Sequence, residues 1–437
     1  MKNLLVALIP FLAIAQEPDW VEIDKRAVAL LQEYIRIPSI NPPADTRAAA
    51  TFLTRELELA GFKVNRFQRD SSGCVNLLTR LEGRDRNAKT LVLLTHMDVV
   101  PVDAKAWSMD PFGGEMKDGY IWGRGALDMK GIGIQQLTAL VQMKKLGIVP
   151  PRDIVFAATC DEETGGAHGV KWLVANHWDK LNPAFVMDEG GFGSRDLLIP
   201  NKLAFGIAVG EKQLAWLRLR AKGTAAHGSQ PIPDNANDIL LTAISKAMAL
   251  PAGGKRHPVV DEMIRNLGEL AQNKLTNAIQ KNTMSLTTLR AGVGDPPKVN
   301  VIPSSSEATL DCRLLPGVNS AEFISEVKAR INDPRVTVEL LSDPLDTGVS
   351  SSQTPMFAVI KAAILKHNPT AVVTPMLVPY GTDSSNFRLK KIPSYGLTPM
   401  VVDAATLATM HSDAERVPVA EFLKGLRIYF DVLRSNF

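Results

Sequence analysis

The sequence has little of what marks several classes of protein. Its three cysteines, Cys74, Cys160 and Cys312, are too few and odd in number for a disulfide framework or a four-thiolate zinc site. A formal charge of +3 over 437 residues does not indicate a nucleic-acid partner, which calls for a clustered basic face. What is present, 45% hydrophobic and 22% charged residues without repeats, is typical of a folded globular chain of two or three domains.

The first residues form a segment of their own. Lys2 precedes an apolar run, Leu4–Ala15, which ends in Ala13-Ile14-Ala15 before the polar Gln16. This pattern is typical of a secretory signal peptide, so we expect cleavage after Ala15; a buried N-terminal helix is the alternative. The run is too short to span a bilayer, and no later segment reaches that length. We therefore expect a protein that is exported, periplasmic or secreted, and not membrane-bound after cleavage.

Helical and strand patterns alternate after this segment. Alternation of this kind predicts a mostly parallel sheet flanked by helices, an α/β fold. The predicted helices cover Val21–Ile37, Arg47–Ala60 and Ile132–Leu146, and the predicted strands Val75–Thr79, Thr90–Thr95, Ile154–Thr159 and Ala184–Met187. Cys160 and Cys312 lie in apolar segments and are predicted to be inert core thiols.

The middle of the chain has a different pattern. Its elements follow the order β-α-β-β-α-β, which is the split βαβ unit of a small α+β domain. They are Gln213–Ala221, Asp238–Leu250, Thr283–Arg290, Glu307–Leu314, Ala321–Ile331 and Val336–Leu341. The predicted organisation is a signal peptide (1–15), a first part of the catalytic domain (16–210), an inserted dimerisation or lid domain (211–345) and a second part of the catalytic domain (346–437).

Acidic residues and histidines follow the apolar strands, where ligands of open α/β sheets usually bind. His96 and Asp98 are two residues apart, so on an extended chain they point to the same side, and a carboxylate often orients a metal-binding imidazole. Asp128 lies in a glycine-rich turn before a helix, where capping that helix is the simpler interpretation. Taken alone, the His96–Asp98 pattern fits a structural pair at least as well as a metal ligand, and the Asp128 pattern favours a helix cap.

Three further segments complete the pattern. Glu162 and Glu163 follow a strand directly, so one can bind a cation while the other takes a proton from water. Asp188 and Glu189 end another strand, and His411 lies near the C-terminus. Oxygen and imidazole ligands without thiolates favour a hydrolytic pair of zinc or manganese ions over a structural zinc site.

Eight segments in order resemble the dizinc amidohydrolases and exopeptidases that include aminoacylase, glutamate carboxypeptidase, acetylornithine deacetylase and succinyl-diaminopimelate desuccinylase. They are LLTHMDVVPVD, WSMDPF, GYIWGRGALDMKG, DEETGG, MDEGG, AHGSQP, VNVIPSS and DCRLLPG. The resemblance covers nearly the whole mature chain. It implies two Zn²⁺ per subunit, with Co²⁺ or Mn²⁺ as possible substitutes, and hydrolysis of an amide or peptide bond.

The resemblance also implies a role for individual residues. Glu162 resembles the general base, and Asp98 the carboxylate that orients His96. The implied metal ligands are His96, Asp128 as the bridge between both ions, Glu163, Glu189 with Asp188 as its rival, and His411. Residues that resemble substrate-binding positions are Asn300, Arg313, Gly381 and Thr382.

His227 has two interpretations. A surface histidine is the simpler one, whereas the resemblance implies that His227 reaches the active site of a partner subunit and stabilises the oxyanion. The expected assembly is therefore a homodimer, and the expected substrate is a peptide or an N-acyl amino acid with a free carboxylate. A non-catalytic metal- or peptide-binding module with the same fold is the alternative to an enzyme.

Overall fold

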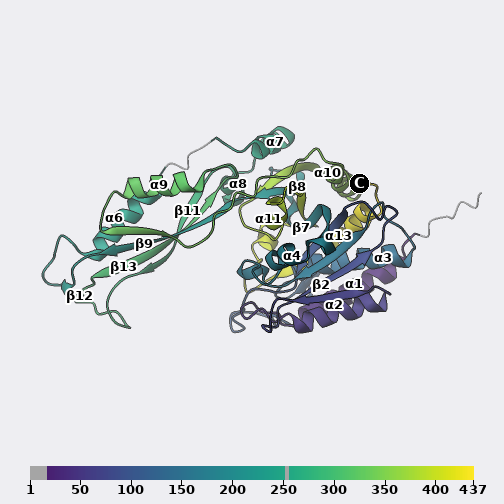
Figure 1. The fold of residues 1–437 in the computed structure, drawn as a ribbon, viewed down its shortest axis with the longest axis horizontal. Coiled ribbons are helices and arrows are strands. Elements are labelled where there is room, and N and C mark those ends of the chain that lie inside the picture. The colour runs from purple at the N-terminus through teal and green to yellow at the C-terminus, as the bar shows by residue number, and fades with distance from the viewer. Residues whose placement is uncertain (1–16, 251–254) are drawn as a thin grey trace, which may run out of the picture.

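The computed structural model describes residues 17–250 and 255–437. The predicted signal peptide and its cleavage site lie outside these residues. In Figure 1 the chain forms a large lobe and a small lobe that projects from it. Among the described residues, no helix combines the length and the apolar content required to cross a bilayer.

The large lobe is built on an eight-stranded sheet in the order β1-β2-β6-β3-β7-β16-β8-β15. The four central strands β6, β3, β7 and β16 are parallel, while β2 is antiparallel to β6, and β8 to β7. The strands are β1 (Val64–Gln68), β2 (Val75–Leu81), β3 (Thr90–His96), β6 (Ile154–Thr159), β7 (Pro183–Arg195), β8 (Leu203–Glu211), β15 (Val372–Val378) and β16 (Ser394–Val401).

Helices cover both faces of this sheet, which confirms the predicted α/β fold. On β3, Leu91 and Leu93 pack in one core and Val92 and Leu94 in another, so the strand is apolar without alternation. The first core includes α1 (Trp20–Ile35), α2 (Arg47–Leu59), α3 (Lys130–Lys145), α10 (Pro355–His367) and α13 (Val419–Leu433). The second includes α4 (Val170–Asn176), α5 (Trp178–Leu181) and α11 (Ser385–Arg388).

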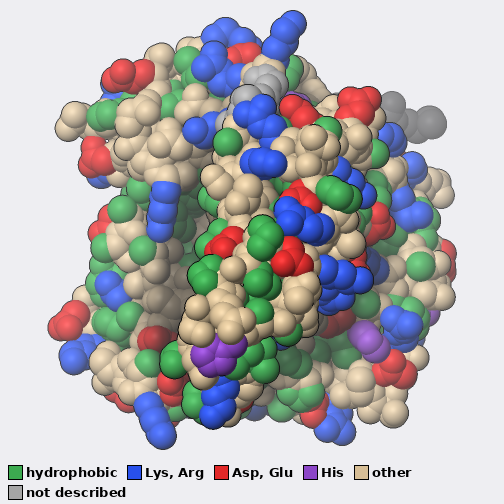
Figure 2. All heavy atoms as spheres, turned by 90° about the vertical axis from the view of Figure 1, so that its left-hand side faces the viewer, with side chains coloured by type: hydrophobic (Ala, Val, Ile, Leu, Met, Phe, Trp, Pro, Cys, Tyr) green, Lys and Arg blue, Asp and Glu red, His purple; other side chains and the backbone are tan. Residues whose placement is uncertain are grey.

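The small lobe is a four-stranded antiparallel sheet in the order β11-β13-β9-β14. Two helices cover one of its faces and enclose a separate core. The elements are β9 (Gln213–Lys222), α6 (Ala236–Met248), β11 (Thr283–Arg290), β13 (Ser305–Leu314), α9 (Ser320–Ile331) and β14 (Val336–Leu340), with β10 (Ala226–His227) paired to β12 (Val301–Ile302). Their order is the predicted split βαβ unit. Figure 2 faces the free end of this lobe, where acidic and basic side chains are interspersed.

Part of the predicted insertion 211–345 packs against the large lobe. Helix α7 (Pro258–Leu267) contributes Val260 and Met263 to the core of the large lobe, and α8 (Lys274–Ile279) contributes Ile279. The remaining elements are the three-stranded sheet of β4 (Glu115–Lys117), β5 (Tyr120–Trp122) and β17 (Arg416–Pro418), the short helix α12 (Ala404–Leu407) and the 3₁₀ turn η1 (Glu162–Thr164). After α8 the chain therefore passes from the large lobe back to β11 of the small lobe.

Candidate metal centre

The parallel strands bring the predicted metal-ligating residues to one edge of the large sheet. Strand β3 ends at His96, η1 with Glu162 and Glu163 follows β6, and Glu189 lies on β7. These three strands are parallel neighbours, so their carboxyl ends lie together. Asp128 comes from the loop before α3. With His411 from near the C-terminus, the result is one cluster whose outermost members, His96 and His411, are 315 residues apart in the chain.

Asp128 lies between the two histidines of the cluster. Its Oδ1 is 3.0 Å from Nε2 of His96, and its Oδ2 is 2.9 Å from Nε2 of His411. The other carboxylates lie one on each side, since Glu189 is 3.5 Å from His96 and Glu163 is 3.5 Å from His411. A carboxylate with each oxygen facing a different imidazole has the geometry required of a bridging ligand.

The tautomer of His96 leaves one ring nitrogen available to this cluster. Nδ1 of His96 lies 2.9 Å from the backbone carbonyl oxygen of Asp98. A carbonyl oxygen only accepts, so Nδ1 carries the hydrogen and Nε2 can present a lone pair to a cation. The ring is buried, so packing fixes its orientation as well.

The donor set fits divalent cations. Two groups of ligand atoms, His96–Asp128–Glu163 and His96–Glu162–Glu189, each lie within 4.8 Å of one another. Oε1 of Glu163 is buried and has no hydrogen-bond partner among the residues that the structure describes. A buried carboxylate oxygen without a partner is costly unless a cation or donor satisfies it. Glu162 belongs to one of these groups, so its distance from the candidate ligands does not distinguish it from them. Its assignment as the general base comes from the family resemblance.

The pKa values reflect an excess of buried negative charge. Burial raises the pKa of Glu162 and Glu189 well above the usual carboxyl range, and neighbouring carboxylates add to this effect. Burial alone would lower the pKa of His96, but Asp128 and Glu189 outweigh it and raise this pKa. Asp128 and Glu163 raise the pKa of His411 to about 10. Bound cations would provide the positive charge that protons provide here.

Of the two rival ligands on β7, the geometry favours Glu189. The carboxylate of Asp188 accepts a hydrogen bond from the backbone N–H of Ser384 at 2.8 Å, whereas that of Glu189 faces His96. Successive residues of a strand point to opposite sides, so only one of the two can face the cluster.

Asp98 differs from the predicted orienting carboxylate. Its nearer side-chain oxygen is 3.7 Å from Nδ1 of His96, beyond hydrogen-bond distance, and the backbone carbonyl of Asp98 holds the ring instead. The carboxylate accepts hydrogen bonds from Asn41 Nδ2 at 2.8 Å, from Glu163 N at 3.1 Å and from Glu162 N at 3.3 Å. Asp98 therefore fixes the loop that carries Glu162 and Glu163.

His227 and Asn300 lie apart from this cluster. They adjoin the β10–β12 pair, where Gly228 N donates to the carbonyl of Asn300 at 2.7 Å. Figure 1 places β12 at the end of the small lobe that points away from the large lobe and β7. His227 is exposed, and its Nδ1 lies 2.7 Å from Ser229 Oγ. The described chain does not bring His227 into the cluster of the same subunit.

The other predicted substrate contacts already have partners within the chain. Arg313 forms a two-point ion pair with Asp311, with N–O distances of 2.6 and 2.9 Å. Thr382 donates both its N–H and its hydroxyl to Oε2 of Glu211 at 2.9 Å, so both donors are already in use. Gly381 packs beside Leu214 at the start of the small lobe, where an added Cβ would lie 3.6 Å from the leucine side chain.

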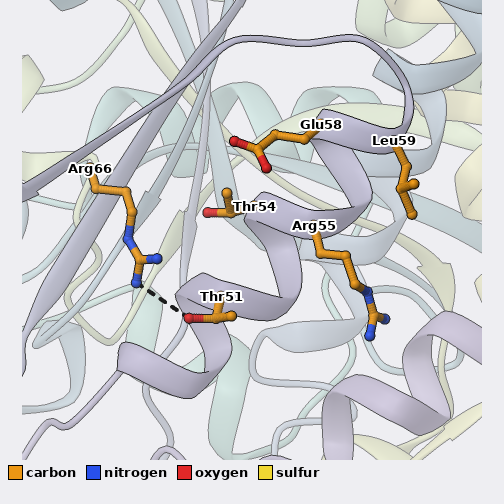
Figure 3. Close-up of a pocket in the computed structure, with 6 residues that line it drawn as sticks. All are labelled: Thr51, Thr54, Arg55, Glu58, Leu59 and Arg66. Atoms are coloured by element: carbon orange, nitrogen blue, oxygen red, sulfur yellow. Dashed lines mark hydrogen bonds between the residues drawn. The ribbon is translucent and has the colours of Figure 1, made fainter.

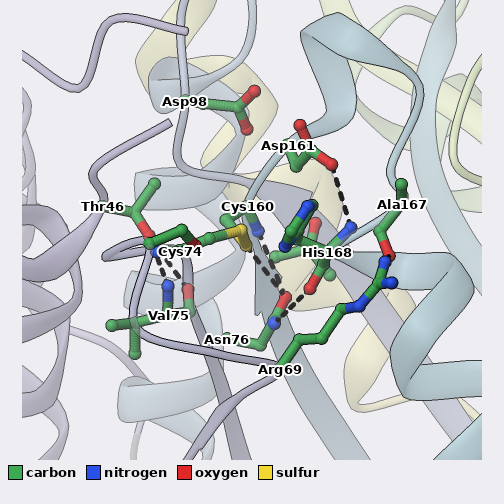
Figure 4. The surroundings of a disulfide bond; sticks show 12 residues. Thr46, Arg69, Cys74, Val75, Asn76, Asp98, Cys160, Asp161, Ala167 and His168 are labelled. Atoms are coloured by element: carbon green, nitrogen blue, oxygen red, sulfur yellow. Dashed lines mark hydrogen bonds between the residues drawn. A yellow bond between two sulfur atoms is a disulfide. The ribbon is translucent and has the colours of Figure 1, made fainter. Parts of the chain in front are cut away.

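The prediction that Cys160 is an inert core thiol was wrong, because Cys160 forms a disulfide with Cys74 (Figure 4). Strand β2 is antiparallel to β6, which places the residue before β2 opposite the residue after β6. The pairing of these strands is not encoded locally, and so the sequence pattern did not reveal it. Cys312 is free and buried, as expected, and burial raises its pKa to about 12.

Two residues around the cluster were not recognised as functional from the sequence. Asn41 holds Asp98, and Glu415 accepts hydrogen bonds from the loop of Asp128. The only available signal was that Glu415 shares the His411 segment. A surface depression between α2 and β1 (Figure 3) contains no predicted site residue and is lined by Thr51, Thr54, Arg55, Glu58, Leu59 and Arg66.

A cluster of histidines and carboxylates at the carboxyl edge of an α/β sheet defines a metal-dependent hydrolase. The model of the Peptidase family M20/M25/M40 matches residues 92–435. The chain belongs to this family, and it is a metal-dependent hydrolase of amide or peptide bonds.

Individual relatives agree with this assignment. Aminoacylase-1 of Sus scrofa is 30% identical over 415 residues, which cover 94% of this chain and 95% of that protein. A probable carboxypeptidase S-like 2 of Dictyostelium discoideum is 27% identical, with coverage of 83% and 74%. Two solved structures share the fold: an M20 family metallo-carboxypeptidase from Sulfolobus solfataricus (TM-score 0.73, 18% identity, coverage 93% and 98%) and human carnosine dipeptidase 1 (0.72, 17%, 95% and 97%).

Proposed function

We propose that the enzyme uses two divalent cations, Zn²⁺ by preference with Co²⁺ or Mn²⁺ as substitutes, to hydrolyse a peptide or an N-acyl amino acid. One ion would be held by His96 and Glu189, the other by Glu163 and His411, with Asp128 shared between them. The observation that carries this proposal is that the two oxygens of Asp128 face different histidines. One carboxylate on each outer side completes the set.

Glu162 is the residue that moves the proton in this proposal. Cations bound here supply charge that acidifies water and polarises a carbonyl. Glu162 takes the proton of the water that attacks the substrate carbonyl carbon and gives it to the leaving nitrogen as the C–N bond breaks. In the metal-free site, burial and the neighbouring Glu189 and Asp383 raise the pKa of Glu162, which favours the uptake of a proton in the first step.

The substrate proposal combines the relatives with Arg313. Relatives named as aminoacylase and carboxypeptidase suggest substrates with a free carboxylate next to the scissile bond. An Arg fork binds carboxylates in two-point fashion, and the Arg313 fork holds the carboxylate of Asp311. In this proposal the substrate carboxylate takes the place of Asp311. Gly381 and Thr382 lie on the same side, since Gly381 packs against Leu214, the residue paired with Arg313, whereas Asn300 lies at the far end of the small lobe beside His227.

A panel of substrates tests the activity. N-acyl amino acids and dipeptides would be incubated with the metal-free protein reloaded with zinc, cobalt or manganese, and release of the free amino acid would be measured. We expect hydrolysis that requires metal, and less of it for carboxamide analogues. Metal binding without hydrolysis of any member would instead favour the non-catalytic binding module.

We further propose that the enzyme is a homodimer in which His227 serves the site of the partner subunit. The exposed position of His227, away from the cluster of its own chain, supports this proposal. An isologous dimer can bring such a residue into the other active site. His227 would there donate a hydrogen bond to the oxygen of the tetrahedral adduct.

Subunit mixing tests this arrangement. His227→Ala and Glu162→Ala should each be nearly inactive alone. After subunit exchange, half of the dimers are mixed and each has one intact site, so roughly a quarter of wild-type activity should return. No recovery, with exchange proven by mass spectrometry, would contradict a role of His227 in the partner site.

Export to the periplasm or the medium is also proposed. The N-terminal pattern supports it, and so does the Cys74–Cys160 disulfide, because disulfides persist mainly in oxidising compartments. Protein expressed with its own N-terminus should be recovered outside the cytoplasm, starting at Gln16. An intact Met1 on the mature protein would contradict this.

A further inference from the structure

Glu415 is a fully buried carboxylate beside the proposed bridging ligand, without being part of the cluster. Its Oε1 accepts hydrogen bonds from the backbone N–H of Leu127 at 2.9 Å and of Asp128 at 3.1 Å. Its Oε2 accepts from Nη1 of Arg124 at 2.7 Å, and Arg124 is buried as well. The four residues that form this contact are all buried: Glu415, Arg124, Leu127 and Asp128.

The backbone of Glu415 is tied to the same loop. Its carbonyl accepts a hydrogen bond from Gly123 N at 2.9 Å, and the following strand β17 pairs with β5, which ends just before Gly123. The loop packs closely against Val99, because a Cβ added to Gly125 would lie only 2.8 Å from Cγ1 of Val99. The φ of Gly125 is +87°, a conformation that suits glycine. The Glu415 carboxylate therefore meets a loop whose path is already restricted.

His411 and Glu415 belong to one short segment, and that segment meets the Asp128 loop at two points. At the first, Nε2 of His411 lies 2.9 Å from Oδ2 of Asp128. At the second, the Glu415 carboxylate binds the main-chain N–H of Asp128. Side chain and backbone of Asp128 are thus both positioned by residues from the same segment.

We propose that Glu415, held by Arg124, is a positioning residue that sets the place of the Asp128 carboxylate relative to His411. This inference rests on the proposed two-metal function. Glu415 would not contact metal or substrate, and would act by fixing the backbone from which the shared ligand projects. Groups that orient metal ligands typically affect metal affinity or activity by about 10- to 100-fold.

Metal affinity tests the proposal directly. Wild type, Glu415→Gln and the control Glu421→Gln would be loaded with Zn²⁺ and titrated with dipicolinate, with the retained metal counted by mass spectrometry. Glu421 is a suitable control because it also accepts a backbone N–H, that of Val401 at 2.9 Å, but lies on α13 and belongs to neither group of candidate ligands. We expect Glu415→Gln to lose at least tenfold in affinity for zinc, and Glu421→Gln to match wild type.

The kinetic pattern separates positioning from a merely structural role. At saturating zinc, Glu415→Gln should have a reduced kcat and a nearly unchanged KM for the substrate. The zinc concentration that gives half-maximal activity should be higher than for wild type. A folded Glu415→Gln protein that keeps zinc like wild type would overturn the proposal. If Glu415→Gln does not fold, Arg124→Lys takes its place, since lysine keeps the charge but not the fork; wild-type zinc affinity in that variant overturns the proposal equally.

Failure of the proposed function would look different. A wild-type protein that binds zinc but hydrolyses no amide refutes the function, while the affinities of wild type and Glu415→Gln still decide the role of Glu415. Conversely, if wild type is active and Glu415→Gln binds zinc as tightly as wild type does, only the positioning role of Glu415 is refuted.

Discussion

The disulfide between Cys74 and Cys160 allows a quantitative prediction. It joins residues 86 apart in sequence, and a cross-link over a loop of that length restricts the unfolded chain. The chain-entropy relation gives about 4.6 kcal/mol for such a loop at 25 °C. Both cysteines are buried in the large lobe, next to the segment that carries Glu162, so reduction should weaken the fold at the proposed site.

The folded surroundings of this bond do not depend on it alone. Asn76 accepts a hydrogen bond from the backbone N–H of Cys160 at 3.2 Å and donates to the carbonyl of His168 at 3.0 Å. His168 N in turn donates to Asp161 at 2.9 Å (Figure 4). These contacts should keep the reduced protein folded, so its stability can be measured rather than lost.

The assay is urea unfolding of oxidised and reduced protein, followed by circular dichroism. With a denaturant slope of about 3 kcal/mol/M, a loss of about 4.6 kcal/mol lowers the midpoint by about 1.5 M. The Cys312→Ala variant, which has only the bonded pair, should show the same shift. Cys74→Ala/Cys160→Ala should have the low midpoint with or without reductant. Equal midpoints for oxidised and reduced protein, with two additional thiols titrated, would refute the reasoning.

Three further predictions concern the site. Glu162→Gln should lower kcat at least about 10²- to 10⁴-fold while both metals stay bound, whereas Asp128→Asn should lose metal and activity together. Metal analysis by mass spectrometry tests both. A Glu162→Gln protein without metal would show that Glu162 is the ligand and Glu163 the base. Arg313→Ala should raise KM about 10- to 100-fold for carboxylate substrates, with little effect on their carboxamides; equal losses on both would indicate a structural role. The metal-free protein should lose stability with rising pH. The pKa values of Glu162, Glu163 and His411 are raised in the folded chain, so these groups release their protons at a higher pH than they do in the unfolded chain. The loss should begin at about pH 4.5, the usual carboxyl value. Above about pH 7 the lowered pKa values of Lys130 and Lys212 oppose it, so a flat urea midpoint between pH 4.5 and pH 7 would contradict the prediction.

Much of the fold follows from local patterns. The continuous apolar run of β3 indicated a strand buried on both faces, and the helices α1, α2 and α3 begin and end within two residues of their predicted bounds. The metal-ligating residues could be located because they follow such strands, and parallel strands end at a common edge. Signals of this kind depend only on residues close together in the sequence.

What the sequence could not predict depends on which segments meet in space. The antiparallel pairing of β2 with β6 joins Cys74 to Cys160, and a buried Glu415 binds a loop that lies almost 290 residues earlier. In each case the neighbouring sequence does not indicate the role of the side chain. The role follows from a contact with a residue far away in the sequence.

The buried acids around the site fall into two sets with different functions. One set faces the histidines. In the other set, each carboxylate accepts a backbone N–H from one of three loops at the site: Asp98 from the Glu162 loop, Asp188 and Glu211 from Ser384 and Thr382 in one loop, and Glu415 from Asp128. Backbone N–H donors favour the charged form of a buried carboxylate, and two members of this set, Glu211 and Glu415, are also paired with the guanidinium groups of Arg388 and Arg124. Metal is therefore expected to bind only the set without backbone donors, and a substitution in the second set should displace a loop rather than remove a ligand.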